Sequence, residues 1–365
     1  MKKIKLTCAH AIVKHLISQK ILINGKKEQL FAGVFGIFGH GNVACLGQAL
    51  QENQKELPTW RGHHEQNMAL TGIAYARAKR RKQIFVATSS VGPGSTNMVT
   101  AAAVAMSNRL PLLLLPGDTY ASRIPEPVLQ QVEHFNNPGI TQNDAFKPVT
   151  RYFDRITRPE QILQSLPQAI QIMLDPADCG PACLSLSQDI QGEVFDYSEE
   201  FFKERVHTIR RPRADDFQIK QAAEKIKKTK CPIIISGGGV FYSDAMDELG
   251  NFAIKHNIPV ILLSVQTTPW RRYEPIHTPY KVPAMLHEAG VRFCISTDPG
   301  YPFDGHVRTL PNEAMRAAAW GLPKSEAIRA ITLSAAEILG IDERVGSLEP
   351  GKDATFFIAD AHPLI

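Results

Sequence analysis

The chain has 365 residues, of which 44% are hydrophobic, enough apolar material for folded cores and for two or three domains. Its 41 basic and 36 acidic residues give a net charge of +5, and the bases are scattered along the chain. This composition excludes a disordered chain and argues against a nucleic-acid-binding surface.

The ends and the cysteines point to a cytoplasmic protein. No hydrophobic signal core follows the basic start, and the longest clear apolar run, residues 110–115, is too short to span a bilayer. Six cysteines without zinc-ribbon spacing are expected to be reduced thiols.

The first 190 residues alternate predicted strands and helices, as in a doubly wound α/β sheet. Thr7 is a predicted helix cap, and a helix is predicted to open at Glu65. The other predicted helices are 43–50, 96–108 and 160–173, and the predicted strands are 30–35, 83–88, 112–115 and 181–186. We therefore expect one α/β domain over residues 1–190.

The remaining residues divide into three predicted segments. Residues 191–215 are charged and irregular, as in a linker, and residues 216–263 predict part of a second α/β domain. Its predicted elements are helices 216–228 and 244–256 and strands 232–236 and 259–263. Residues 264–365 form a third, different segment.

Two motifs at strand-to-helix junctions of the first domain carry the most information. The first is Arg61, His64, Glu65 and Gln66, and the second is Gly92, Pro93, Gly94, Thr96 and Asn97. Together they resemble the pyrimidine-binding domain of thiamine-diphosphate enzymes of the acetolactate synthase type. The wording of residues 34–43, V-F-G-I-F-G-H-G-N-V, resembles the inositol-catabolic trihydroxycyclohexane-dione hydrolases, and the similarity extends over about residues 6–260.

The resemblance implies a catalytic and cofactor-binding role for Glu65. In that family a carboxylate hydrogen-bonded to the aminopyrimidine favours its imino tautomer, while the cofactor supplies the carbanion chemistry for ring opening. Gly39, His40, Pro93 and Asn97 are expected near the pyrimidine ring. The alternative interpretation makes Glu65 a helix N-terminal charge stabilised by the helix dipole.

The residues of the two motifs around Glu65 and Gly92 do not match known metal-binding or phosphate-binding motifs. His64-Glu65 lacks the second histidine of H-E-x-x-H, and the Gly92-Pro93-Gly94 loop lacks the G-K-[ST] ending of a phosphate loop. We therefore predict neither a zinc site nor a phosphate loop there.

The third segment resembles the C-terminal part of a metal-dependent amidohydrolase. The resemblance rests on residues 287–299, the P-N-E-A-M-R-A-A-A-W-G-L segment that follows, and V-G-S-L-E-P-G-K-D-A-T-F-F-I at 345–358. It implies that Asp298 is a metal ligand, and a turn and strand are expected at 345–358. The other ligands of that family have no counterpart, and about 100 residues are too few for a complete barrel, so Asp298 is interpreted as a lone remnant.

The first resemblance is also incomplete. The sequence contains no G-D-G, the start of the motif with which these enzymes bind the diphosphate and Mg²⁺. The resemblance therefore implies half of a thiamine-diphosphate site, completed in the family by the diphosphate domain of another subunit, and we expect a homo-oligomer or such a docked assembly. A small-molecule substrate, by resemblance a cyclic polyol dione, is expected.

Three functional hypotheses remain open. The first is a thiamine-diphosphate enzyme-like protein derived from the dione hydrolases, with the diphosphate and Mg²⁺ domain missing. The second is an amidohydrolase acting on C–N bonds, and the third is a non-catalytic partner of a complete thiamine-diphosphate enzyme.

Overall fold

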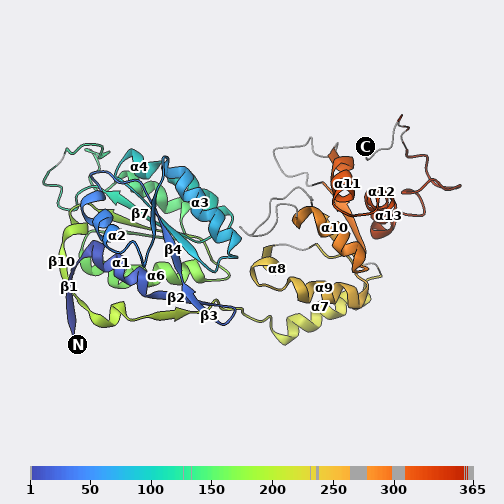
Figure 1. Ribbon diagram of the computed structural model, residues 1–365, viewed down its shortest axis with the longest axis horizontal. Coiled ribbons are helices and arrows are strands. Elements are labelled where there is room, and N and C mark those ends of the chain that lie inside the picture. The colour runs from blue at the N-terminus through green and yellow to red at the C-terminus, as the bar shows by residue number, and fades with distance from the viewer. Residues whose placement is uncertain are drawn as a thin grey trace. The chain divides into compact units, whose positions relative to one another are not determined.

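The computed structural model describes residues 2–263 apart from 126, 133, 231 and 236–237, then 278–297, 309–356, 358 and 360. The chain divides into two compact units, Met1–Arg211 and Pro212–Ile365 (Figure 1). Each unit is described by itself below.

A six-stranded parallel sheet forms the centre of the first unit. The strands follow the spatial order β5-β4-β6-β7-β9-β8. Their bounds are Phe31–Gly36 for β4, Thr59–Arg61 for β5, Ile84–Ser89 for β6, Leu112–Asp118 for β7, Tyr152–Ile156 for β8 and Pro181–Ser187 for β9. Because β6, β7 and β9 are buried at every residue, the sheet is covered on both faces, which confirms the predicted doubly wound α/β fold.

Two pairs of helices cover the sheet. Helices α1 (Cys8–Ser18) and α6 (Ile162–Leu174) share one hydrophobic core with Leu113 and Leu115 of β7. Helices α3 (Glu65–Ala78) and α5 (Val99–Ser107) pack together on the other face, where Gly72 of α3 lies against Leu112 and Phe85. Alternate residues of β7 therefore face opposite helix pairs.

Local chemistry fixes where two of these helices begin. The Thr7 side chain accepts a hydrogen bond from His10 N at 3.2 Å, so Thr7 caps α1 as predicted. Glu65 is the first residue of α3, also as predicted, and the side chain of His64 caps that helix.

Two predicted helices are each divided in the structure. Residues 43–50 form a π-helical turn, η1 (Val43–Gly47), followed by α2 (Gln48–Glu52). The predicted helix 96–108 is preceded by a short helix α4 (Pro93–Thr96), and α5 starts at Val99. Proline at the first position of α4 has the φ angle that suits a helix start, which sequence periodicity alone does not locate.

Two small outer sheets and several short helices complete the first unit. Strand β1 (Lys3–Thr7) pairs antiparallel with β10 (Val194–Ser198). Strand β2 (Gln19–Ile23) lies between β3 (Lys26–Gln29) and β11 (Arg205–His207). The short 3₁₀ helices are η2 (Gln142–Val149), η3 (Pro159–Gln161), η4 (Ile190–Gly192) and η5 (Glu199–Phe202).

These outer strands correct the predicted linker at 191–215. Tyr197 of β10 is fully buried, and its hydroxyl donates a hydrogen bond to Pro159 O at 3.1 Å. The charged residues that suggested a linker are the exposed side chains of a folded segment, and the longest irregular stretch is residues 208–215.

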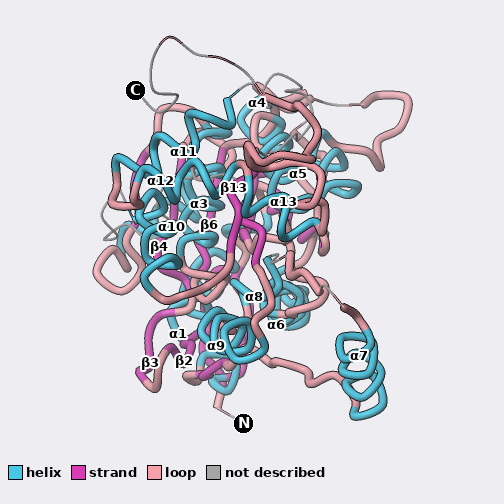
Figure 2. The backbone as a smooth tube through the Cα atoms, turned by 90° about the vertical axis from the view of Figure 1, so that its right-hand side faces the viewer, coloured by secondary structure: helices cyan, strands magenta, loops and turns pink. Residues whose placement is uncertain are grey.

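The second unit combines a two-stranded parallel sheet with helices. Strand β12 (Val260–Leu263) pairs with β13 (Phe293–Ser296), and β13 contacts α10 (Thr278–Glu288), α11 (Leu310–Ala319), α12 (Lys324–Ile331) and α13 (Leu333–Leu339) (Figure 2). Its apolar core gathers small and apolar side chains of these elements, including Phe293, Ile295, Ala314 and Leu322.

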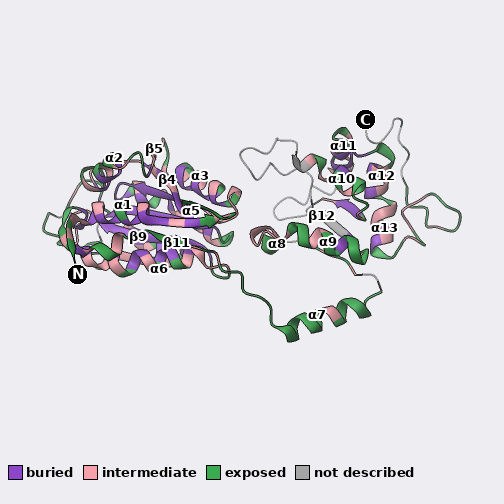
Figure 3. Cartoon of the chain, turned by 60° about the horizontal axis from the view of Figure 1, so that its bottom comes forward, coloured by how far each residue is buried: buried purple, intermediate pink, exposed green. Residues whose placement is uncertain are grey.

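The first part of this unit is less extensively packed. Helix α7 (Asp216–Lys228) has the predicted bounds, and none of its residues is buried (Figure 3). It is followed by α8 (Gly238–Tyr242) and α9 (Met246–His256). The strand predicted at 232–236 is absent over its described residues 232–235, where one hydrogen bond joins Ile234 N to Pro259 O at 3.1 Å.

The strand expected near the C-terminus is also absent from the described part of 345–358. Residues 345–353 form turns, held by a hydrogen bond from Asp353 N to Arg344 O at 2.7 Å. A strand needs a neighbour for its backbone groups, and the described residues provide none for this segment. Among the described residues, no helix is both long and apolar enough to cross a membrane.

Candidate functional site

The site forms where two strand-to-helix junctions of the first unit meet. Glu65 follows β5 and Asn97 follows β6, and parallel strands bring these junctions to the same edge of the sheet. Asn97 Nδ2 donates a hydrogen bond to Glu65 Oε2 at 2.8 Å. Glu65 is half-buried, and no residue that the structure describes donates a hydrogen bond to its Oε1.

The glycine loop between these residues leaves space beside the carboxylate. A Cβ atom at Gly94 would lie 3.4 Å from Glu65 Oε1. Gly92 has φ +70°, and a Cβ atom there would lie 1.7 Å from Gln130 O. Pro93 is exposed at the first position of α4. Steric contacts therefore require glycine at position 92. Glycine at position 94 leaves the space beside Glu65 Oε1 free of a side chain.

His64 also lies at this junction, although the sequence did not single it out as a site residue. Its Nδ1 accepts a hydrogen bond from Asn67 N at 3.4 Å, and its Nε2 lies 3.4 Å from Asn97 Nδ2. Asn97 is therefore within reach of both His64 and Glu65. The position of His64 directly before a predicted helix start was the available signal.

Gly39 approaches the same loop from β4. A Cβ atom at Gly39 would lie 2.7 Å from Ser90 Oγ, and one at Gly94 would lie 3.8 Å from Ser90 Cβ. Ser90 therefore lies between Gly39 and the loop that contacts Glu65.

His40 lines a neighbouring cavity of about 280 Å³ at the same edge of the sheet. The other polar residues of its lining include Tyr120, Gln188, Asp189 and Gln191, and no lysine or arginine is among them. The Asp189 carboxylate already accepts hydrogen bonds from the backbone N–H groups of residues 121, 122 and 190. His40 Nε2 and Gln191 Oε1 are buried and have no hydrogen-bond partner among the described residues.

Asp118, which follows Gly117 at the end of β7, is held in an ion-pair network. Asp118 is fully buried, and Arg155 Nε donates to its Oδ2 at 2.9 Å. Arg155 Nη2 also reaches Asp144 Oδ2 at 2.8 Å. Burial alone would raise the pKa of Asp144, but hydrogen bonds from Lys147, Thr141 N and Arg155 outweigh it and lower that pKa. Arg155, itself held by Asp118, therefore anchors residues 139–144 to the sheet.

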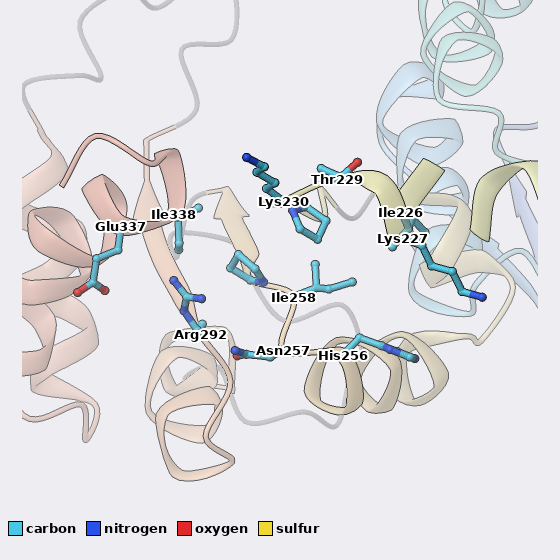
Figure 4. Close-up of a pocket in the computed structure, with 12 residues that line it drawn as sticks. Ile226, Lys227, Thr229, Lys230, His256, Asn257, Ile258, Arg292, Glu337 and Ile338 are labelled. Carbon is cyan, nitrogen blue, oxygen red and sulfur yellow. The ribbon is translucent and has the colours of Figure 1, made fainter. Parts of the chain in front are cut away.

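The second unit contains a separate cavity of about 420 Å³ (Figure 4). Asn257 and Ile258 line it just before β12, and Arg292 lines it just before β13, so it lies at the amino ends of these strands. Glu337 at its wall is paired with Arg329 at 2.6 Å. Catalytic residues of α/β barrels follow the carboxyl ends of strands, the opposite end of this pair.

Asp298 lies outside the described residues, so the structure gives it no position. Within the described part of both units, no group of three histidine, cysteine, aspartate or glutamate side chains is arranged to hold a metal ion.

Three family models match the chain. Residues 19–137 match the thiamine pyrophosphate enzyme N-terminal TPP binding domain, and residues 219–267 match the central domain of the same enzymes. Residues 279–364 match the amidohydrolase family. Both predicted resemblances are therefore confirmed, and the thiamine pyrophosphate model covers Gly39, His40, Glu65, Pro93 and Asn97.

Curated relatives match 71% of the chain's length. The chain is 51% identical over 260 residues to the 3D-(3,5/4)-trihydroxycyclohexane-1,2-dione hydrolase of Clostridium botulinum, and 50% identical over 259 residues to that of Clostridium tetani. It is 48% identical over 260 residues to the protein of the same name from Bacillus subtilis. The match spans only about 40% of the length of these relatives.

Proposed function

We propose that the first unit holds the aminopyrimidine ring of thiamine diphosphate, with Glu65 as the carboxylate that hydrogen-bonds a ring nitrogen. The observation that carries this proposal is the 2.8 Å hydrogen bond from Asn97 to Glu65 Oε2. It fixes one oxygen of the carboxylate and leaves Oε1 directed to the space beside Gly94. A half-buried carboxyl group with one uncommitted oxygen can share a proton with a ring nitrogen, either by donating its O–H to the nitrogen or by accepting from a ring N–H.

The residues around Glu65 have distinct proposed roles. Asn97 orients the carboxylate, Gly39 lets the turn after β4 approach Ser90, and Pro93 starts the short helix that carries Asn97 to Glu65. His40 lines the polar cavity next to that turn. When bound, thiamine diphosphate would supply the carbanion chemistry, and Glu65 would hold a shared proton at a pyrimidine nitrogen.

We propose a cyclic polyol dione as the substrate class and hydrolytic ring opening as the reaction. This follows the activity for which the relatives are named, and they are about 50% identical to this chain over the matched residues. The cavity beside His40 is lined by polar side chains and the Asp189 carboxylate, with no lysine or arginine, so it suits a hydroxyl-bearing molecule better than an anion.

We further propose that the chain supplies half of the cofactor site and that another subunit supplies the diphosphate and Mg²⁺ groups. The 365 residues contain no G-D-G. Large apolar side chains are exposed on the segment that follows β7, including Ile124 at 88% and Phe135 at 79%. Exposed apolar side chains of this size are typical of surfaces that another domain or subunit covers.

Calorimetric titration with thiamine diphosphate tests the role of Glu65. The unsubstituted chain is expected to bind the cofactor with an affinity that Mg²⁺ does not change, and Glu65→Gln is expected to weaken binding at least tenfold. If Glu65 were only a charge stabilised by the helix dipole, the substitution would cost about 0.3–1 kcal/mol of stability and leave binding unchanged.

A matched control is available in the second unit. Glu248 lies in the first turn of α9, as Glu65 does in α3. Glu248→Gln removes the same charge from a helix start and should leave cofactor binding within twofold. Tight, Mg²⁺-dependent binding by the chain alone would contradict the half-site proposal but not the role of Glu65.

A second candidate function rests on the match of residues 279–364 to the amidohydrolase family. It predicts stoichiometric bound zinc or a similar metal and its loss in Asp298→Ala. Metal analysis of the purified chain decides it, because a metal-free protein rules it out.

The third candidate, a non-catalytic partner, predicts that the chain associates with a complete thiamine-diphosphate enzyme. Analytical ultracentrifugation of the mixture tests it. Sedimentation of the chain as a monomer in the presence of that enzyme argues against it.

A further inference from the structure

The turn after β4, residues 37–42, is held by two buried carboxamide side chains. Asn42 is 2% exposed; its Oδ1 accepts a hydrogen bond from Gly39 N at 3.0 Å, and its Nδ2 donates to Thr88 Oγ1 at 3.1 Å. Gln191 is 1% exposed, and its Nε2 donates to Gly41 O at 2.7 Å. The turn is therefore tied to β6 on one side and to the segment after β9 on the other.

Close backbone packing leaves this turn little room to move. A Cβ atom at Gly41 would lie 2.7 Å from Val91 N, and one at Gly117 would lie 2.8 Å from Gly41 O. Gly41 N also donates a hydrogen bond to Ser90 Oγ at 3.3 Å. Ser90 and Val91 lead directly into Gly92 and the loop that contacts Glu65, so the turn and that loop are adjacent parts of one packed layer.

The hydrogen-bond partners around residue 42 require an amide side chain. The Thr88 hydroxyl gives its proton to Leu115 O at 2.7 Å, so it offers Asn42 only lone pairs. The second contact of Asn42 Nδ2, Ile37 O at 3.4 Å, is also an acceptor. An amide satisfies two acceptors and one N–H donor here, whereas a carboxylate of the same shape would place oxygen against oxygen.

We propose that Asn42 is a positioning residue that fixes the turn carrying Gly39 and His40, and through Ser90 fixes the loop that contacts Glu65. The fixing of the turn stands on the hydrogen bonds alone. Its effect on ligand binding rests on the proposed function.

Hydrogen exchange followed by mass spectrometry tests the fixing of the turn. In Asn42→Asp, the peptide covering residues 37–47 should exchange at least tenfold faster relative to β9 than in the unsubstituted chain. Gln83→Glu is the matched control, because Gln83 is 6% exposed and its Nε2 donates to Gln29 O at 2.9 Å, at the amino end of β6. It should leave the ratio unchanged, and equal acceleration in the two variants would overturn the inference. If Asn42→Asp does not fold, Asn42→Ser replaces it with the same expectation.

Nuclear magnetic resonance titration with thiamine diphosphate tests the consequence for binding. Asn42→Asp should raise the dissociation constant at least tenfold, and Gln83→Glu should change it less than twofold. Unchanged affinity in an Asn42→Asp chain whose turn exchanges faster would overturn the positioning role. If the unsubstituted chain does not bind the cofactor, the proposed function fails, and the exchange experiment alone decides the inference about Asn42.

Discussion

At the scale of single residues, steric contacts explain why one turn requires glycine and another does not. Gly92 has no room for a side chain, whereas a Cβ atom at Gly25, also at positive φ, would have nothing within 4 Å. The same unusual backbone angle therefore carries different consequences in the two turns. From the sequence alone, Gly92 and Gly25 are both predicted simply as glycines in turns.

Replacing Gly92 by alanine should destabilise the first unit much more than replacing Gly25. Both substitutions place an L residue at positive φ, which costs about 1–2 kcal/mol. Gly92→Ala adds the overlap with Gln130 O, so its free energy of unfolding should fall by at least about 2 kcal/mol more than that of Gly25→Ala. Urea denaturation measures the difference, and equal losses would show that residue 130 moves away freely.

The stability of the first unit should fall as the pH falls from about 6.5 to about 4. Burial lowers the pKa of His15 to about 4, although its hydrogen bond to Phe201 O at 2.8 Å acts in the opposite direction. The unfolded chain takes up the proton near pH 6.5 and the folded chain only near pH 4, so the contribution is complete above 6.5 and is lost progressively below it.

His15→Gln should flatten this pH dependence by about 2 kcal/mol, since it removes the titrating ring. Denaturation midpoints measured between pH 7 and pH 4 test this expectation. His63→Gln, at an exposed position, is the control and should leave the slope unchanged. A slope that His15→Gln does not alter would assign the pH dependence to other groups, including His207, whose pKa burial also lowers to about 4.

At the scale of elements, strands with a local apolar pattern are predicted from the sequence, whereas strands that form by pairing with distant segments are not. The parallel strands β4, β6, β7 and β9 are apolar runs bounded by turns, and the sequence predicts all four. Strands β1 and β10 are missed because each becomes a strand by pairing with a segment about 190 residues away. The same limit applies to the site. The sequence motif predicts Glu65 and Asn97 as site residues. The contact of Gln191 with Gly41 joins residues 150 positions apart, so no local sequence pattern predicts it.

Amide exchange should distinguish the folded and irregular parts of the segment predicted as a linker. Amides of β10 and β11 that pair with β1 and β2 should be protected, because their backbone groups are hydrogen-bonded. Amides of residues 208–215 should exchange at nearly unstructured rates. Uniformly fast exchange from 194 to 215 would contradict the pairing of β10 and β11.

At the scale of the whole molecule, two compact units are joined by a short irregular segment. The division falls at Arg211, and Arg210, Arg211 and Arg213 lie within the irregular residues 208–215. The first unit contains its own complete sheet with helices on both faces. It therefore has the features of a domain that keeps its structure without the second unit.

Brief digestion with trypsin should first cut the chain after Arg210 or after Arg213, because exposed irregular backbone is the preferred site of cleavage and the Arg211–Pro212 bond resists trypsin. The product covering residues 1 to about 211 should resist further digestion. Mass spectrometry identifies the first cut, and a first cut after Lys14 in α1 or Arg77 in α3 would contradict the independence of the first unit. Lysine-rich α7, with no buried residue, is expected to be cleaved next.

The pairing of β12 with β13 has a consequence for the origin of the chain. Strand β12 lies within the match to the thiamine pyrophosphate enzyme central domain, and β13 lies within the match to the amidohydrolase family. Segments that match two different families thus share one ladder, which is possible because strand pairing uses backbone groups common to every sequence. Among the described strands, β13 covers one edge of β12 in a two-stranded sheet, so removing the amidohydrolase-like part would leave both edges of β12 unpaired and expose a further template for aggregation.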